Sequence, residues 1–445
     1  MNTGVAPAGR MEVNEASASY VDEAGLRAPK GYKQTEVGVI PEEWEVSTVG
    51  AEFSIQLGKM LDAEKNIGVP KPFLGNRAVQ WGRIDLNDIG EIKLTPSDLK
   101  RFRLREGDLL VCEGGEIGRA AIWRQPIDEC YFQKALHRLR PIRGYNLSLM
   151  LNMLQRLALT GYLQNFVTQT SIAHLPKDKF KTVPIPLPPN KAEQEAIAEA
   201  LSDADALIES LEQLLAKKRQ IKQGVMQELL SGKKRLPGFE VKPGNKQSDA
   251  GVFPEDWGVV ALGDMTDCLD SLRVPLNETQ REKRRGDIPY CGANGVLDHI
   301  NDFVIDDDII LIAEDGGYFD EYATRPIAYR MTGRCWVNNH AHILKAKVGT
   351  DQAFIYFSLV HKNILRFLAS GTRAKLNRAE LDKIEIPLPP TKAEQEAIAT
   401  LLSDMDAELA ALESKLAKAR QIKQGMMQEL LTGKTRLLAP GACHA

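Results

Sequence analysis

The amino-acid sequence predicts an α+β protein built as an internal repeat, in which two mixed α/β domains are joined by two long helices. Two observations carry this prediction. Residues 186–236 and residues 387–437 align without a gap, and about 37 of the 51 paired positions are identical. A shorter motif, the lead-in, also occurs twice, as KQTEVGVIPEEWEV at residues 33–46 and as KQSDAGVFPEDWGV at residues 246–259. Repetition at this level indicates two units in tandem.

Each copy of the long repeat has the pattern of a coiled-coil helix. Alternating steps of four and three residues give an apolar seam with Glu, Lys and Gln around it. The seam comprises Ile197, Leu201, Ala204, Ile208, Leu211, Leu215, Lys218, Lys222, Val225 and Leu229 in the first copy, and Ile398, Leu402, Met405, Leu409, Leu412, Leu416, Ala419, Lys423, Met426 and Leu430 in the second. A helix from about residue 190 to 231 would be roughly 60 Å long. Because such a stripe cannot face water alone, we expect the two helices to pack on each other.

The ends of both helices carry start and stop signals. A proline run before each helix predicts a stiff, extended approach that is not itself helical. Gly232 and Gly433 follow the last apolar turn and are themselves followed by basic residues. That order is typical of a left-handed C-cap at the negative end of a helix dipole.

The segments between lead-in and helix are only faintly alike, yet they share a framework. REGDLLVCEGGEIGRAAIW (residues 105–123) predicts a buried strand, a glycine turn and a second strand, and DDDIILIAEDGGYF (residues 306–319) repeats the strand and turn. CYFQKALHRLR (residues 130–140) aligns with CWVNNHAHILK (residues 335–345). Helical stretches are expected at residues 147–163 and 352–370. Each segment is therefore predicted to be a mixed α/β domain of about 140 residues, a size typical of one domain.

Composition describes an ordinary soluble globular protein of 445 residues, 43% hydrophobic and 26% charged, which is long enough for two or three domains. No run of 18 apolar residues occurs, and residues 1–30 lack the features of a signal peptide, so we expect a cytoplasmic location and no membrane contact. Six cysteines without a CxxC pair or a histidine cluster predict reduced thiols and no metal site. A net charge of −3 leaves any nucleic-acid contact to local basic patches or to a basic partner.

The sequence also lacks a catalytic constellation. Both Pro-Pro pairs are followed by Asn190 or Thr391, so neither belongs to an Asn- or Asp-Pro-Pro-aromatic motif for amino methylation. No glycine-rich loop ends in Gly-Lys-Ser or Gly-Lys-Thr. The carboxylates of EGGE (residues 113–116) and EDGGYFDE (residues 314–321) are better explained as turns at strand ends than as a nuclease centre. We expect a protein that is not itself an enzyme.

Two nearly constant helices joined to two divergent domains suit recognition of a target with two different parts. A rigid spacer of roughly 60 Å would span about 18 base pairs of DNA at 3.4 Å each. The lead-ins GVIPEEW and GVFPEDW, the helix starts PLPP-x-KAEQEAIA, and the helix ends IKQGVMQELLSGK and IKQGMMQELLTGK resemble the specificity subunit of type I restriction-modification systems. The likeness covers nearly all of the chain after residue 30.

The resemblance implies an architecture and a set of partners. The two long helices would pair as an antiparallel coiled coil, giving the repeat a pseudo-twofold axis, and each target-recognition domain would read one half of an asymmetric, interrupted site in double-stranded DNA. Two adenine methylation subunits would be recruited, with restriction subunits in the full assembly. S-adenosylmethionine, ATP and Mg²⁺ are expected in those partners, and no cofactor in this chain. The predicted parts are an N-terminal tail (1–30), recognition domain 1 (31–186), the central helix (187–236), recognition domain 2 with its linker (237–386), the C-terminal helix (387–437) and a short tail (438–445).

Candidate DNA contacts are the Arg, Asn, Gln and Lys side chains of the divergent domains. Arg, Asn and Gln can read guanine or adenine bidentately, and Lys and Arg neutralise phosphates. The candidates are Lys100, Arg101, Arg103, Gln133, Lys134, Arg138 and Ser171 in the first domain, and Arg284, Arg285, Arg334, Asn338, Asn339, Thr372, Arg373 and Lys375 in the second. A solvated charged face remains the alternative for the basic runs, and Ser171 or Thr372 could instead cap a short helix.

Candidate partner-binding residues lie near the helix ends, where both copies keep polar side chains that the apolar seam does not require. They are Lys222, Gln223, Gln227, Lys423, Gln424 and Gln428. A self-contained coiled coil is the alternative for these positions. For the whole chain the alternatives are a coiled-coil scaffold that joins two proteins without reading DNA, and the detached recognition part of a single-chain restriction enzyme.

Overall fold

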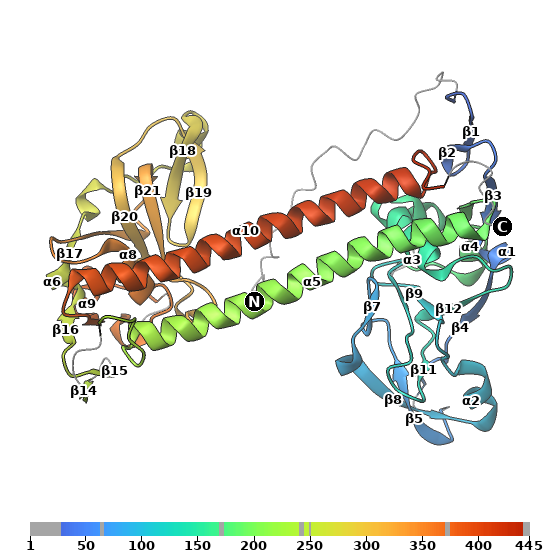
Figure 1. Cartoon of the computed structure of the whole chain (residues 1–445), viewed down its shortest axis with the longest axis horizontal. Helices are drawn as coiled ribbons and strands as arrows, with labels where there is room; N and C mark the ends of the chain where they lie inside the picture. Colours follow the sequence, from blue (N-terminus) through green and yellow to red (C-terminus); the bar gives the residue numbers. More distant parts are fainter. Residues whose placement is uncertain are drawn as a thin grey trace, which may run out of the picture. The chain divides into compact units, whose positions relative to one another are not determined.

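The structure, a computed structural model, describes residues 28–62, 66–168, 173–239, 244–248, 251–369 and 374–438 (Figure 1). Most of the two predicted tails therefore lies outside the described residues. The chain divides into two compact units, one formed by Met1–Ser210 with Leu416–Ala445 and the other by Leu211–Lys415. The division passes through both long helices, so each unit holds one mixed domain and part of each helix.

The two copies of the long repeat form α5 (Lys191–Leu230) and α10 (Lys392–Leu430), drawn in green and red in Figure 1. Of the twenty predicted seam residues, eleven are buried and nine are half-buried. The buried seam residues are Ile197, Leu201, Leu211, Leu215 and Leu229 of α5, and Ile398, Leu402, Leu416, Ala419, Lys423 and Leu430 of α10. Residues near the helix ends belong to the domain cores, whereas Leu211, Leu215 and Leu416 lie outside those cores. The helices are thus part of both domains.

Within each unit the two helices run antiparallel, which confirms the predicted architecture. In the unit with the first domain, the ammonium group of Lys423 lies 2.6 Å from the carboxylate of Asp205. In the other unit, Lys222 pairs with Asp406 in the same way. Each pair is converted into the other by the 201-residue shift of the repeat. The helix pairing therefore follows the internal repeat: α10 supplies the lysine in one unit, and α5 supplies it in the other.

A buried arginine connects the end of α5 to the start of α10. Arg235 donates to both carboxylate oxygens of Glu394, with 2.7 Å from Nη2 to Oε2, and to Asp256 at 3.1 Å. The guanidinium also lies over the ring of Trp257, 5.7 Å from its centroid. Glu394 is only 1% exposed, and the positive charge of Arg235 offsets the desolvation cost of burying its carboxylate.

The same contact is repeated in the other unit. Arg436, after the end of α10, donates to both oxygens of Glu193 at the start of α5, with 3.0 Å from Nη2 to Oε2, and pairs with Glu43. Its guanidinium lies 5.9 Å from the ring centroid of Trp44. We call the two contacts the clasps. The basic residues expected only to complement a helix dipole thus hold the lead-in motif and the other helix together.

The glycines at the helix ends are required by the same packing. Gly232 and Gly433 have φ values of +66° and +69°, which confirms the predicted left-handed C-caps. A Cβ on Gly232 would lie 2.4 Å from the ring of Pro254, and one on Gly433 would lie 2.6 Å from Pro41. Each lead-in therefore packs directly against a helix end that only glycine can form.

The first domain consists of short strands and a few short helices (residues 28–187). Its strands are β1 (Tyr32–Thr35), β2 (Gly38–Pro41), β3 (Glu45–Thr48), β4 (Phe53–Leu57), β5 (Val69–Leu74), β6 (Val79–Gln80), β7 (Arg83–Ile84), β8 (Ile89–Leu94), β9 (Leu109–Cys112), β10 (Ala120–Ile122), β11 (Tyr131–Phe132), β12 (Leu136–Pro141) and β13 (Pro184–Leu187). Its helices are α1 (Val49–Glu52), α2 (Pro96–Phe102), α3 (Leu147–Leu159) and α4 (Lys177–Lys181). The main sheets have the orders β10-β9-β12-β4 and β11-β5-β8.

The second domain repeats this plan with longer strands (residues 244–388). Its strands are β14 (Asn245–Ser248), β15 (Gly251–Pro254), β16 (Gly258–Ala261), β17 (Thr266–Cys268), β18 (Arg285–Gly292), β19 (Gly295–Ile300), β20 (Ile305–Ala313), β21 (Ala328–Val337), β22 (Ala341–Ala346) and β23 (Glu385–Leu388). Its helices are α6 (Leu262–Met265), α7 (Glu278–Glu282), α8 (Gln352–Leu359) and α9 (Arg378–Leu381). One six-stranded sheet has the order β17-β22-β20-β21-β18-β19.

The sheets differ because one strand of the second domain corresponds to two of the first. In the second domain the single strand β21 pairs first with β20 and then with β18. In the first domain two separate strands make the corresponding pairings, β10 with β9 and β11 with β5.

The helix expected over residues 352–370 is shorter than predicted, since α8 ends at Leu359. Beyond it, the side chain of Asn363 accepts the backbone N–H of Leu365, a local bond that competes with a continued helix.

The clasps give a stability prediction. Replacing Arg235 by Ala leaves the Glu394 carboxylate buried without its cation, and we expect a loss of about 3–5 kcal/mol in the free energy of unfolding. Arg219→Ala is the matched control, because its pair with Glu413 has both side chains about half exposed and should change that free energy by less than about 1 kcal/mol. Urea denaturation of the two variants measures both values, and equal losses would contradict a structural role for the clasp.

Candidate nucleic-acid interface

Several loops of each domain meet at one surface, held by the same backbone hydrogen bonds. In the second domain the N–H of Glu314 donates to His340 O (2.9 Å), and the N–H of Leu376 donates to Glu314 O (2.7 Å). In the first domain the N–H of Glu113 donates to Ala135 O (2.9 Å), and that of Leu175 donates to Glu113 O (2.7 Å). We call this surface the loop edge and define it as residues 75–76, 113–119, 133–135 and 173–175 in the first domain, and residues 292–295, 314–318, 338–340 and 374–376 in the second.

A carboxamide occupies the same place in both loop edges. A Cβ on Gly75 would lie 3.1 Å from Nε2 of Gln133, and one on Gly292 would lie 3.3 Å from Nδ2 of Asn338. Gly75 follows β5 and Gly292 is the last residue of β18, and each of these strands pairs in parallel with the segment before the amide. The two edges therefore share a glycine–amide contact, although the surrounding sequence has diverged.

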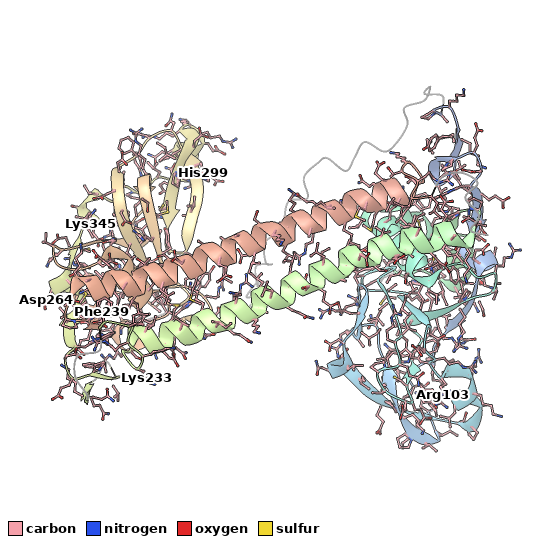
Figure 2. All side chains as sticks on the ribbon, viewed as in Figure 1. Arg103, Lys233, Phe239, Asp264, His299 and Lys345 are labelled. Carbon is pink, nitrogen blue, oxygen red and sulfur yellow. The ribbon has the colours of Figure 1, made fainter. Side chains whose placement is uncertain are left out.

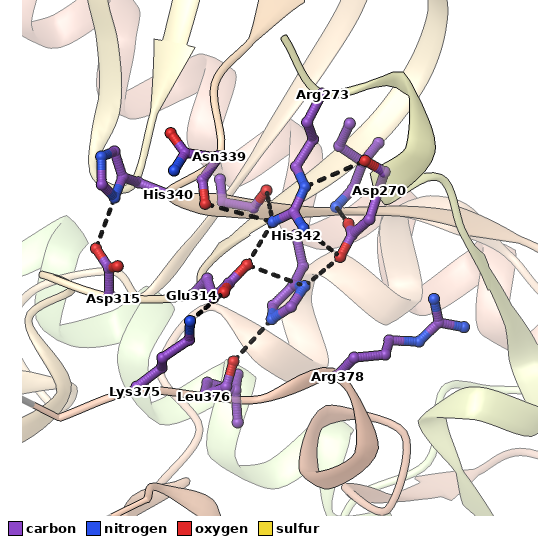
Figure 3. Close-up of polar contacts among 12 residues, drawn as sticks. Asp270, Arg273, Glu314, Asp315, Asn339, His340, His342, Lys375, Leu376 and Arg378 are labelled. Carbon is purple, nitrogen blue, oxygen red and sulfur yellow. Dashed lines mark hydrogen bonds and ion pairs between the residues drawn. The ribbon is translucent and has the colours of Figure 1, made fainter. Parts of the chain in front are cut away.

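The second loop edge contains a dense network of charged groups (Figure 3). The carboxylate of Glu314 accepts from Arg273 and lies 2.8 Å from the ammonium group of Lys375. Burial opposes ionisation of Glu314, but its bonds to Lys375 and Arg273 outweigh this effect, so its pKa is lowered. At the rim of this network, His340 Nδ1 lies 2.7 Å from Asp315. The loops of this edge are thus tied to one another by ion pairs.

Each domain also carries a buried histidine behind its loop edge. Nε2 of His342 lies 2.8 Å from Leu376 O, and Nε2 of His137 lies 2.9 Å from Leu175 O. Nδ1 of His342 lies 2.6 Å from Asp270, whereas Nδ1 of His137 has no hydrogen-bond partner among the described residues. The position of Asp270 is taken in the first domain by Leu57, which pairs with His137 in the β4–β12 register.

Three groups of the second domain are close enough to share a metal ion. The ligand atoms of Cys268, Asp270 and His342 all lie within 4.8 Å of one another. Burial raises the pKa of the Cys268 thiol to about 12, so the thiol stays protonated. Asp270 is engaged by the N–H of Ile343 and by Arg273 at 3.2 Å, and a structural zinc site would need a fourth ligand. The absence of a metal site stays a prediction.

The structure separates the predicted DNA-contact residues into groups. Gln133, Lys134, Asn338, Asn339 and Lys375 belong to the loop edges, where Lys134 and Asn339 are exposed and Asn338 is buried with its Oδ1 accepting the N–H of His340 (2.8 Å). Ser171, Thr372 and Arg373 lie outside the described residues.

The remaining basic candidates lie on helices and strands. Lys100 and Arg101 are exposed on α2, and Arg103, labelled in Figure 2, follows that helix. Arg138 is buried and donates to the carbonyl groups of Arg101 and Arg103, so its guanidinium is occupied within the domain. The other candidates of this group are Arg284, 3.6 Å from Asp302, Arg334, 3.2 Å from Asp306, and Arg285, exposed at the start of β18.

The predicted partner-binding residues also divide. Lys222 and Lys423 make ion pairs between α5 and α10, and Lys423 is only 6% exposed, so these two lysines bond within the chain. The glutamines keep exposed side chains in both copies; they are Gln223, Gln227, Gln424 and Gln428. Only the glutamines therefore remain on the surface as a repeated feature.

The sequence analysis did not predict several residues that have structural roles. Arg235 and Arg436 hold the clasps, and Gln194 and Gln395 use their side chains to bind the loops that precede α3 and α8. All four are identical in both copies of the long repeat. Their identity in both copies at the helix ends was the available signal, and these four residues attach the helices to the domains.

A comparison with known families identifies the fold. The sequence profile described as "Type I restriction modification DNA specificity domain" matches residues 41–222 and 254–423. The chain belongs to this family.

Relatives of the family match over nearly their whole length. The putative type I restriction enzyme MjaX specificity subunit of Methanocaldococcus jannaschii is 26% identical over 434 residues, covering 92% of this chain and 97% of the relative. The MjaVIII specificity subunit of the same organism is 24% identical over 438 residues, covering 89% and 94%. The crystal structure of a type I restriction-modification system S subunit from M. genitalium has a TM-score of 0.59 at 18% identity, covering 87% of this chain and 96% of that one, and shares the fold.

Burial of His137, whose Nδ1 has no hydrogen-bond partner among the described residues, predicts a pH dependence of stability. Burial lowers the pKa of His137 from 6.5 to about 4. Above pH 6.5 the imidazole is neutral in both the folded and unfolded states, so its contribution to stability is complete. Between pH 6.5 and about 4 the unfolded chain binds a proton that the folded chain does not, and stability falls with pH.

We expect this group to lower the free energy of unfolding by about 2 kcal/mol between pH 7 and pH 5. His137→Asn removes the titrating group, so the loss over that interval should shrink by about this amount. Urea denaturation at the two pH values measures the difference. An unchanged loss in the variant would contradict the assignment of this window to His137.

Proposed function

We propose that each domain reads one half of a bipartite, asymmetric site in double-stranded DNA. The observation that carries this proposal is the pair of loop edges. Their backbone bonds are equivalent, but polar side chains at matched positions differ, as with Lys134 and Asn339, or His174 and Lys375. A duplicated frame with two different polar surfaces suits a target with two different halves.

The chemistry of the loop edges fits DNA recognition. Glutamine and asparagine side chains can bond adenine at two atoms, and lysine neutralises phosphates. Gln133 and Lys134 in the first edge and Asn339 and Lys375 in the second supply these groups. Arg101 and Arg285 are exposed outside the edges and would contact the phosphate backbone of the flanking duplex. Arg138, being buried, would act by holding the segment between α2 and β9.

The proposal assigns the chemistry of the system to partner subunits. Two adenine methylation subunits would bind S-adenosylmethionine, and restriction subunits would use ATP and Mg²⁺, while this chain would neither catalyse nor hold a cofactor. The repeated exposed glutamines Gln223, Gln227, Gln424 and Gln428 would form equivalent docking positions, one set for each methylation subunit.

The expected location is the cytoplasm. Among the described residues, no helix has both the length and the apolar character needed to cross a bilayer.

The experiment is to map adenine methylation genome-wide in a host that expresses the chain with its methylation subunit. We expect a split, asymmetric motif. Exchanging residues 40–185 for the corresponding domain of another family member should change one half of the motif, and exchanging residues 253–386 should change the other half.

An unexchanged chain supplies the control for expression and assembly. A stable complex that gives no chain-dependent methylation would contradict the proposal and favour a scaffold that joins proteins without reading DNA. A motif in which both halves change after a single exchange would contradict the assignment of one half to each domain.

A further inference from the structure

The two loop edges carry a glutamate at the same place, in opposite surroundings. Glu113 and Glu314 are each held by one backbone bond to the turn before β12 or β22 and by another to the segment before α4 or α9. The main chain therefore presents the two carboxylates in the same way. What differs between the domains is the set of cations available to each.

Glu314 is neutralised by residues of its own domain. Arg273 and Lys375 both bond its carboxylate, and Figure 3 shows the group enclosed between them. Arg273 comes three residues after Asp270, in the turn that follows β17. Each oxygen of this carboxylate is bonded to a cation of the domain, so the group ties the loops of the second edge together.

Glu113 lacks both of these partners. The backbone N–H of Lys59 donates to Phe132 O as that of Val274 donates to Val337 O, so the place of Arg273, directly before Val274, is taken in the first domain by Gly58, which has no side chain. The place of Lys375 is taken by His174. In the part of the chain that the structure describes, the Glu113 carboxylate receives no hydrogen bond. Lys134 and His174 act on it only through their charge, and burial raises its pKa.

Once DNA covers this surface and displaces water, a half-buried carboxylate without a donor is unfavourable unless the ligand supplies one. On a surface that meets polyanionic DNA the phosphates cannot do so, because they are acceptors and carry the same charge. The donors that the major groove offers are the exocyclic amino groups of cytosine, N4, and adenine, N6. Carboxylates pair with the cytosine amino group in known protein–DNA contacts.

We infer that Glu113 is a specificity-determining residue that accepts a hydrogen bond from the exocyclic amino group of one base in the half-site read by the first domain. Gln133 and Lys134 lie on the turn bonded to Glu113 and would fix neighbouring contacts. Glu314 does not have this role, because Arg273 and Lys375 already bond its two oxygens. The inference rests on the proposed DNA-reading function and makes it specific to one side chain and one class of donor.

The test compares isosteric amide variants in the complete methylation complex. Glu113→Gln removes the charge and replaces one acceptor oxygen by an amino donor. Methylation of the original motif should fall on the order of 10- to 100-fold, and one position of the first half-site should lose its preference for cytosine or adenine. The base lost from the motif identifies which amino group is read. The second half-site should stay unchanged.

Glu106→Gln is the matched control, since Glu106 is an exposed glutamate of the same domain outside the loop edge. It should leave motif and methylation level unchanged. Glu314→Gln should lower the thermal unfolding midpoint, because it weakens the ion pairs with Arg273 and Lys375. If Glu113→Gln lowers that midpoint instead and reduces methylation without altering any base preference, Glu113 is structural and the inference is overturned.

An unaltered motif at an unaltered level in Glu113→Gln would also overturn the inference while leaving the proposed function intact. Absence of a bipartite, chain-dependent motif with the unmodified chain would instead remove the proposed function, and the role of Glu113 with it. The unmodified chain is measured first, so the two failures are distinguished.

Discussion

The structure depends on a reciprocal ion pair between the end of each long helix and the start of the other. Arg235 reaches Glu394, and Arg436 reaches Glu193, with a tryptophan of the lead-in motif beneath each guanidinium. The second contact completes the first domain with residues from the last part of the chain. Each compact unit is therefore assembled from both repeats, which explains why the lead-ins, helix starts and helix ends have stayed alike while the domains between them diverged.

The lead-ins and helix ends held by the clasps have to stay alike in both repeats, whereas the side chains of the loop edges are free to differ. Backbone bonds at Glu113 and Glu314 hold the loop edges in equivalent conformations, and the glycine–amide contacts of Gln133 and Asn338 are equivalent too. Side chains around this shared backbone then decide what each edge does. Where the second domain has Arg273, the first has Gly58, so Glu314 is tied to neighbouring loops by ion pairs and Glu113 stays an acceptor open to a ligand.

Sequence reasoning succeeded where the information is local or repeated. The spacing of apolar residues and the internal sequence repeat were enough to predict α5, α10, their C-caps and the common strands β9 and β20. They could not show that β21 is continuous where β10 and β11 are separate, because that depends on pairing between distant strands. Lys423 illustrates a different failure: its place in the seam was noted, but its burial against Asp205 requires the antiparallel register of the helices. The contrast between Glu113 and Glu314 likewise depends on Arg273 and Lys375, which are about 40 and about 60 residues away from Glu314 in the sequence.

The central claim is that the loop edges, rather than the basic residues of α2 or the start of β18, read DNA. Hydrogen–deuterium exchange of the methylation complex, with and without a duplex carrying its methylated motif, tests this most directly. The account predicts slower exchange at residues 113–119 and 133–135 in the first domain and at 314–318 and 338–340 in the second. Protection confined to α2, to the start of β18 or to the long helices would contradict it.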